Sequence, residues 1–386
     1  MPVKFVKYIA LLALWLLAGC HRGMPAVAFH AEGQPPKLSD WHVIESHDGK
    51  LELNAGVVPY NLNTHLFTDY VHKLRTIWMP RGSSAKYTKE GPLDFPVGTI
   101  ISKTFYYPRA DKSSAAGSSY ADVARTLDYT GDFAGQGLNL ASVHMIETRL
   151  LVLRKDGWAP FTYVWNDAQT EATLARTGAV EPLTLVDAQG GREDFNYVVP
   201  DEGQCVTCHE ANMLSRKIQP IGPQARHMNR DYDFGSGRQN QLEHLAAIGY
   251  LSDLPKLADV PHDANWRDPG ASLDARARAY LDINCAMCHN PNGVANVTGL
   301  SLGHATPETH HLGICKSPEA AGPGTGGRLF DIVPGKPDES ILMYRMASTR
   351  PGVMMPEIGR STVDREGMAL IRAWIVSLKG DCTIVH

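Results

Sequence analysis

NCAMCHNPNG, residues 284–293, contains two cysteines three positions apart, followed at once by a histidine. The same pattern occurs in QCVTCHEANM, residues 204–213. C-x-x-C-H spacing is typical of covalent haem attachment, because two thiols can form thioethers at one porphyrin edge while the next imidazole reaches the iron. We therefore predict two covalently bound haem c groups. The predicted attachment cysteines are Cys205, Cys208, Cys285 and Cys288, and the predicted iron ligands are His209 and His289.

Two other interpretations of these motifs compete with haem. A redox-active dithiol requires no adjacent histidine. A zinc site would gather four thiolates around one ion and leave both histidines unused. Two complete copies of the motif, in a chain that carries an export signal, favour haem.

The N-terminal segment indicates export. Two lysines precede an apolar run, residues 8–18, which is too short for a comfortable transmembrane helix and is typical of a secretory signal. LAGC, residues 17–20, resembles a lipobox, in which the cysteine becomes a lipidated N-terminus. We expect a signal peptide over residues 1–19 and a lipid anchor at Cys20. His21 favours the periplasmic side of the outer membrane, by resemblance to lipoprotein sorting.

Composition gives broad limits. The chain has 386 residues, of which 43% are hydrophobic and 20% charged, as in ordinary soluble globular proteins. A net charge of −4 argues against nucleic acid as a partner. We expect a redox protein as partner, and a membrane contact only through the lipid anchor.

The pattern of the chain predicts an α+β multidomain fold, with an N-terminal β-rich domain followed by mainly α-helical cytochrome c-type haem domains. β-branched and aromatic runs, hairpin signals at residues 155–157 and 190–191, and a polar insertion near residues 109–140 indicate the β-rich part. The predicted segments are 1–19 for the signal peptide, 20–38 for a linker, 39–200 for the β-rich domain, 201–265 for the first haem segment and 266–386 for the second haem domain.

The second haem domain resembles a class I cytochrome c. A helix capped at Ser272 is expected to run into Cys285, and a final helix is expected to start at Thr362 or Asp364 and stop at Gly380.

The sixth iron ligand decides whether a haem transfers electrons or reacts with small molecules. For the second haem we predict Met355, which precedes Pro356 in MMPEIG just before the last helix, with Met354 as the alternative. Pro291 resembles the proline whose carbonyl accepts the second N–H of the proximal histidine in such domains.

The sixth iron ligand of the first haem is harder to predict from the sequence. We predict Met228, and we leave open His227 and a ligand from the β-rich domain. Met213, close behind His209, is expected on the proximal side.

Two cysteines are left over. In an oxidising compartment, Cys315 and Cys382 are expected to form a disulfide that closes a loop of about 67 residues and stabilises the fold by about 4 kcal/mol. The alternative makes Cys315 an iron ligand, as in some sulfur-oxidising cytochromes. Three nearby arginines either pair with haem propionates or are solvated: Arg345, Arg350 and Arg360.

The chain resembles a family of exported dihaem c-type cytochromes of Gram-negative bacteria. The resemblance lies in GVVPYNLNTHLFTDY and FPVGTIISKTF near the N-terminus, in QCVTCH, PIGPQAR and NQLEHLAAIGYLSDLP around the first motif, and in DINCAMCHNPNG, DIVPGKPDESILMYRM and MMPEIGR near the end. It implies two covalent haems, export and electron transfer, and it assigns no substrate.

Three functional hypotheses follow. The leading one is a membrane-anchored dihaem c-type cytochrome that transfers electrons in the periplasm, and so a carrier more than an enzyme. The alternative is a dihaem oxidoreductase, peroxidase-like or oxidising a small molecule, with an open coordination site at the first haem. In a third, the β-rich domain is a binding module. No catalytic residues are predicted.

Overall fold

The computed structural model describes residues 24–110, 120–127, 133, 137–210, 212 and 215–383. The predicted signal peptide, the lipidation residue Cys20 and Met213 lie outside these residues. No helix in the described part of the chain is long and apolar enough to cross a membrane.

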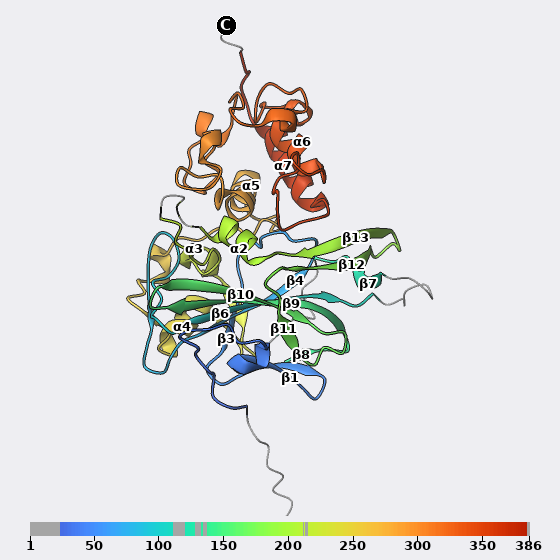
Figure 1. The fold of residues 1–386 in the computed structure, drawn as a ribbon. Helices are drawn as coiled ribbons and strands as arrows, with labels where there is room; N and C mark the ends of the chain where they lie inside the picture. The colour runs from blue at the N-terminus through green and yellow to red at the C-terminus, as the bar shows by residue number, and fades with distance from the viewer. Residues whose placement is uncertain are drawn as a thin grey trace, which may run out of the picture.

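The centre of the N-terminal part is a six-stranded antiparallel sheet with the order β11-β10-β9-β6-β4-β3 (Figure 1). Its strands are β3 (Val58–Tyr60), β4 (His72–Trp78), β6 (Ile100–Pro108), β9 (Val143–Arg154), β10 (Gly157–Trp165) and β11 (Ala172–Leu174). The long strands β6, β9 and β10 are rich in β-branched and aromatic residues, which favour a pleated, half-buried surface. Strands β9 and β10 form the hairpin predicted at residues 155–157.

Smaller sheets flank this one. They are formed by β1 (Ile44–His47), β2 (Lys50–Leu53) and β8 (Leu138–Asn139); by β7 (Ala121–Ala124), β12 (Ala179–Val186) and β13 (Arg192–Val199); by β14 (Asp231–Asp233) and β15 (Arg238–Asn240); and by β5 (Ala85–Lys86) and β16 (Leu251–Ser252). The β12–β13 hairpin turns at the predicted Gly190. Val27 and Phe29, within the predicted linker, pack against the core beneath the main sheet.

The described residues form six α-helices, all of them after residue 200. They are α2 (Glu202–His209), α3 (Ala225–Met228), α4 (Gln241–Ala247), α5 (Leu273–Leu281), α6 (Ile341–Ala347) and α7 (Arg365–Ser377). A π-helical turn, η3 (Asp282–Ala286), continues α5. Short 3-10 turns are η1 (Leu38–Trp41), η2 (Leu257–Asp259), η4 (Asn296–Thr298), η5 (His310–Leu312), η6 (Gly322–Thr325) and η7 (Pro337–Glu339).

The predicted fold class is wrong in its second half. The structure is β-rich, with 28% strand and 21% helix, and the two segments predicted to carry haem are not mainly helical. Most of the helices after residue 200 are short and are separated by loops. The physical reason lies in proline- and glycine-containing stretches such as residues 218–223 and 320–327, which lack the backbone donors or the conformational restriction that a helix needs.

Residues 201–265, predicted as the first haem segment, pack directly onto the main sheet. Leu242 and Leu245 of α4 share one hydrophobic cluster with Ile77 of β4 and Ile101 of β6. The second haem segment has its own cluster, which includes Trp374 of α7.

Buried hydrogen bonds join the N-terminal part to the end of the chain. The Asp69 carboxylate accepts from the backbone N–H of Ser361 (2.8 Å) and from the N–H of Thr362 (2.7 Å). It also accepts from the Thr362 hydroxyl (2.8 Å). Asp69 and Tyr70 have φ values of 45° and 64°, in the left-handed region that non-glycine residues rarely adopt. These hydrogen bonds help to hold that conformation.

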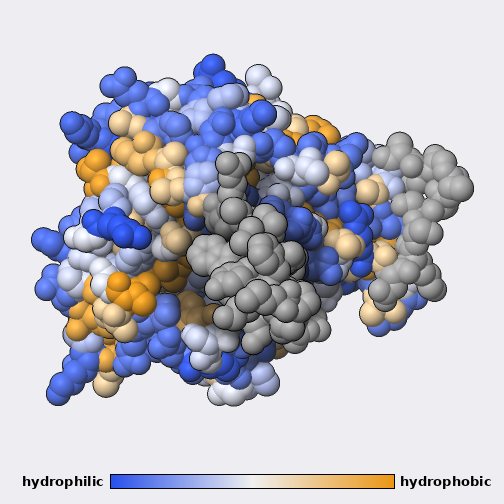
Figure 2. Space-filling view, turned by 90° about the horizontal axis from the view of Figure 1, so that it is seen from below, coloured by the Kyte–Doolittle hydropathy of each residue, from blue (hydrophilic) through white to orange (hydrophobic). Residues whose placement is uncertain are grey.

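Cys315 and Cys382 are joined by a disulfide with an S–S distance of 2.06 Å. It ties the chain end beyond α7 to the loop before η6. On the face seen in Figure 2, hydrophilic side chains predominate and hydrophobic ones are interspersed among them.

Candidate functional site

The first C-x-x-C-H motif forms the last part of α2. Asp201 caps this helix by accepting a hydrogen bond from the N–H of Gln204 (2.8 Å), whose side chain accepts in return from the Asp201 N–H. Cys205, Cys208 and His209 occupy positions i, i+3 and i+4, which lie on one face of a helix. The whole motif is therefore presented toward one side.

The second motif follows α5 without a break. The Ser272 hydroxyl caps α5 by accepting from the Ala275 N–H (3.2 Å), as the sequence predicts. The π-helical turn then carries Cys285, and the His289 N–H donates to the Cys285 carbonyl (2.9 Å), so one further helical turn spans the motif.

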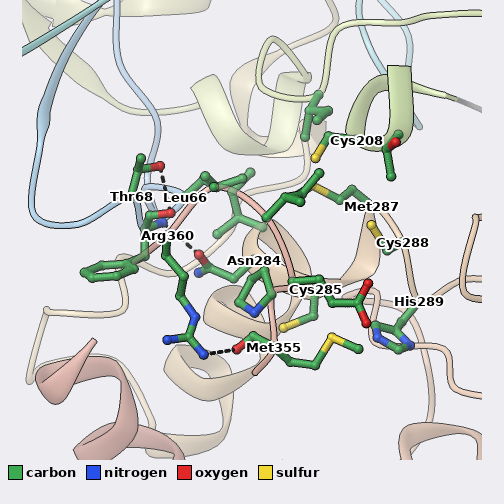
Figure 3. A pocket seen from close by; sticks show the side chains of 18 of the residues that line it. Leu66, Thr68, Cys208, Asn284, Cys285, Met287, Cys288, His289, Met355 and Arg360 are labelled. Atoms are coloured by element: carbon green, nitrogen blue, oxygen red, sulfur yellow. Dashed lines mark hydrogen bonds between the residues drawn. The ribbon is translucent and has the colours of Figure 1, made fainter. Parts of the chain in front are cut away.

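Both motifs line one cavity of about 860 Å³. Figure 3 shows Met287, from within the second motif, between Cys208 and Cys288. The remaining walls come from distant parts of the chain: the main sheet, the loop at residues 220–223, and the segment from Met354 to Ser361. The size and the largely apolar lining suit a bulky, mostly hydrophobic ligand.

The Nδ1 atom of each motif histidine has a hydrogen-bond partner. His209 Nδ1 lies 2.8 Å from the Gln219 carbonyl, and His289 Nδ1 lies 3.2 Å from the Thr298 hydroxyl. These contacts occupy Nδ1 and leave Nε2 for a metal, which is the usual arrangement around a ligating histidine. The partner of His289 is therefore Thr298 and not the Pro291 carbonyl that the sequence suggests.

Both imidazoles are neutral near pH 7. The pKa of His209 is lowered to about 4, mainly by burial; the Gln219 hydrogen bond opposes this shift, and the charges of Lys103 and Arg149 add to it. Burial, with a smaller effect of Arg345, lowers the pKa of His289 to about 4. A neutral imidazole is the form that binds a metal.

The four motif cysteines are free thiols. Burial raises the pKa of Cys285 and of Cys288 to about 12, and it also raises the pKa values of Cys205 and Cys208. A redox dithiol instead needs a lowered thiol pKa. Within the described residues, the four sulfurs do not gather closely enough to hold one metal ion, which disfavours the zinc interpretation.

Met355 lines the cavity, as does the alternative ligand Met354. Figure 3 shows the Met355 side chain close to Cys285 and His289. Arg360 is buried and donates to the carbonyls of Met355 (2.9 Å) and Ser348 (2.8 Å). Arg345 Nε donates to the Val353 carbonyl (2.9 Å).

These arginines hold the backbone of the methionine loop in place. Arg360 is thus neither a solvated surface charge nor free for a propionate. Arg350 is exposed.

The structure does not bring Met228 to the cavity. Its side chain is fully buried in the cluster between the main sheet and α4. It is absent from both cavity linings in the described part of the chain. The function proposed below therefore does not use it.

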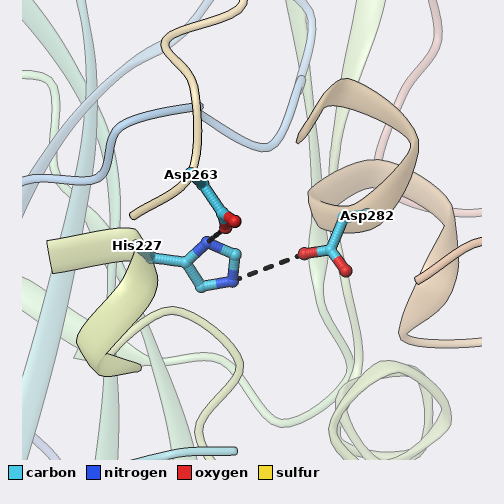
Figure 4. A group of neighbouring side chains, drawn as sticks. All are labelled: His227, Asp263 and Asp282. Atoms are coloured by element: carbon cyan, nitrogen blue, oxygen red, sulfur yellow. Dashed lines mark ion pairs between the residues drawn. The ribbon is translucent and has the colours of Figure 1, made fainter. Parts of the chain in front are cut away.

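His227 belongs to a buried ionic cluster (Figure 4). Its Nδ1 lies 2.8 Å from Asp263 Oδ2, and its Nε2 lies 3.7 Å from Asp282 Oδ2. Three such residues could hold a metal ion. However, Arg226 Nη1 lies 2.9 Å from the same Asp263 oxygen and 2.8 Å from the same Asp282 oxygen, so its guanidinium already supplies the positive charge that these carboxylates need.

A second cavity, of about 1030 Å³, adjoins the first motif. Cys208 and His209 line both cavities. His304 and His311 lie on the wall of the second one. His209 can therefore be approached from two sides.

Sequence reasoning missed the sheet wall of the main cavity. Arg75 of β4, Lys103 of β6 and Arg149 of β9 all line it. The available signal was a charged residue at an inward position of an otherwise apolar strand, as in IISKTF (residues 100–105) and IETRLL (residues 146–151).

Comparisons with known proteins add no family: no protein-family model, curated protein or solved structure matches this chain.

Proposed function

We propose that this protein is a dihaem c-type cytochrome that transfers electrons. Cys205 and Cys208 would hold one haem through thioethers, with His209 as iron ligand. Cys285 and Cys288 would hold the other haem, with His289 and Met355 as its iron ligands. The bound irons would supply the Fe(III)/Fe(II) couple, and methionine ligation would raise the reduction potential of the second haem.

One observation carries the proposal: both C-x-x-C-H motifs line the same cavity. The fit is supported by the paired Nδ1 hydrogen bonds, which leave both Nε2 atoms for iron, and by the protonated thiols. A continuous, largely apolar space that reaches both motifs supports electron transfer between the haems.

Haem stoichiometry tests the proposal. The chain is produced with the machinery that attaches haem c, and haem per chain is measured by the pyridine haemochrome assay and by intact mass. We expect two haems in the native sequence. We expect one in Cys205→Ala with Cys208→Ala, and one in Cys285→Ala with Cys288→Ala. The control, Cys315→Ser with Cys382→Ser, should keep two. A protein that binds zinc in place of haem would contradict the proposal.

The alternative function, a dihaem oxidoreductase with an open site at the first haem, is favoured by the second cavity beside His209. Low-temperature EPR of the oxidised protein and CO binding by the reduced protein separate the two. Two low-spin signals without CO binding indicate a carrier. A high-spin signal that persists in Met355→Ala, together with CO binding, indicates an open site at the first haem.

We also propose, from the sequence, that the protein is anchored by a lipid at Cys20 on the periplasmic side of the outer membrane and exchanges electrons with another redox protein. Cys20→Ala should then move the protein from the membrane fraction to the soluble periplasmic fraction. Unchanged membrane association would contradict the anchor.

A further inference from the structure

The strand register places three cationic side chains in one line across the sheet. Arg75 on β4 pairs with Lys103 on β6, and Lys103 pairs with Arg149 on β9. We call these three residues the cationic row. Directly paired residues point to the same face of a sheet, and all three line the cavity that both motifs share.

The adjacent line of the sheet adds little negative charge. It contains Lys73, Phe105 and Glu147, in that register. Glu147 is fully buried and is the single carboxylate of the two lines. It accepts from Arg149 Nε (2.7 Å) and from the Tyr197 hydroxyl (2.8 Å). Four basic residues and one carboxylate therefore lie on these two lines, and burial lowers the pKa values of both lysines.

Lys103 forms no salt bridge with a carboxylate of the described residues. Its ammonium lies 5.0 Å from the centre of the Phe105 ring. Burial and, to a smaller extent, the charges of Arg75 and Arg149 together lower the pKa of Lys103 to about 7, although Glu147 acts in the opposite direction. Like charges paired directly across strands destabilise a sheet, and they do so more strongly away from water. An anion in the cavity would relieve this repulsion.

The cationic row faces the first motif. Cys205, Cys208 and His209 line the same cavity as the three side chains of the row. Near the second motif the cavity wall carries other cationic side chains, Arg345 and Arg360.

We propose that the cationic row is an anion-binding site of the first haem pocket, which takes a carboxylate or a small oxyanion. The anion comes either from the propionates of the bound haem or from solution. This inference rests on the proposed haem attachment at the first motif. In this proposal the main sheet forms the wall of the first haem pocket that binds an anion, either a haem propionate or one from solution.

Lys103→Gln is the informative variant. It removes the positive charge without adding a residue that ligates iron readily. It also leaves the Arg149–Glu147 pair intact. Replacing Arg149 would instead leave the buried Glu147 carboxylate without its cationic partner. The matched control is Lys155→Gln, because Lys155 is exposed in the β9–β10 turn. Haem content is measured first on every protein.

Two measurements then follow on the dihaem proteins: titration with inorganic phosphate, observed by calorimetry and by the haem spectrum, and the midpoint potential of each haem. If the row takes a free anion, phosphate binds the native protein and Lys155→Gln, and binds Lys103→Gln at least tenfold more weakly. If the propionates fill the row, phosphate does not bind. The first haem's potential then falls in Lys103→Gln alone, because a lost positive charge favours Fe(III).

A protein with two haems in which Lys103→Gln changes neither phosphate binding nor either potential would overturn the inference and leave the dihaem function standing. A protein without haem would overturn both.

Discussion

The two C-x-x-C-H motifs differ in the sequence distance between each motif and the residues that surround it. The second motif finds its candidate ligand Met355 and the supporting Arg360 within the same C-terminal segment. The first motif is walled by β4, β6 and β9, which precede it and are separated from one another by long loops. A local motif can therefore indicate where a cofactor would attach, while sheet topology sets the charge around that position.

The largest expected effect concerns the second motif alone. Met355→Ala should lower the potential of the second haem by on the order of 200 mV, because loss of the thioether sulfur removes a ligand that favours Fe(II). A potentiometric titration should show that the potential of the first haem is unchanged. Met354→Ala, a neighbour that also lines the cavity, is the control. Equal shifts in both haems would show that the two sites are not separable.

The next prediction concerns the ionic cluster where the two haem segments meet. Asp282→Asn should reduce the free energy of unfolding by about 3–5 kcal/mol, because it leaves Arg226 without one of its two buried carboxylates. Urea denaturation measures this, with exposed Asp259→Asn as the control. A loss below about 1 kcal/mol, on the order of a surface pair, would contradict it.

The same cluster predicts a pH dependence. Burial raises the pKa of Asp282, but hydrogen bonding by His304 and the charge of Arg226 outweigh it, so the folded pKa lies below the ordinary value. A carboxyl of this kind stabilises the fold above its unfolded pKa of about 4, and this stabilisation is lost as the pH falls further. Asp282→Asn should therefore flatten the fall in stability below about pH 4.

Loss of the disulfide should reduce the free energy of unfolding by an amount similar to that expected for Asp282→Asn. Its sequence separation of 67 residues corresponds to about 4 kcal/mol in the chain-entropy model, so Cys315→Ser with Cys382→Ser should lose that much stability. Haem content should remain at two. Loss of the second haem in this variant would instead make the disulfide part of the haem site.

The smallest effect is expected where the β-rich part contacts the methionine loop. Asp69→Asn should cost about 2 kcal/mol, because the amide cannot accept all the hydrogen bonds that Ser361 and Thr362 donate to the carboxylate. The methionine–iron charge-transfer band should weaken along with stability. Asp48→Asn, at an exposed turn, should change neither.

Much of the local structure could be predicted from sequence, since it depends on neighbouring residues. The hairpin at residues 155–157, the cap at Ser272 and the helix that begins after Asp364 all occur where turn and capping residues place them. The amount of helix after residue 200 was overestimated, since loops rich in proline and glycine occupy much of that region.

The errors at the site have a common cause. Met228 has a suitable distance along the chain from His209, yet α4 and the main sheet enclose its side chain in a hydrophobic cluster. Lys103 and Arg149 meet only through the register of β6 with β9, although they lie far apart along the chain. Sequence spacing does not determine such contacts.

The cavity draws its walls from residue 62 to residue 368, which has a consequence for biosynthesis. A chain exported from its N-terminus delivers the main sheet and both motifs before the segment that carries Met355 and Arg360. Until that last segment arrives, the enclosure around the motifs lacks one side. If haem is attached and the chain is exported as proposed, the attachment enzymes would have access to both motifs during export. A stalled chain that ends just before the methionine loop should then still accept both haems.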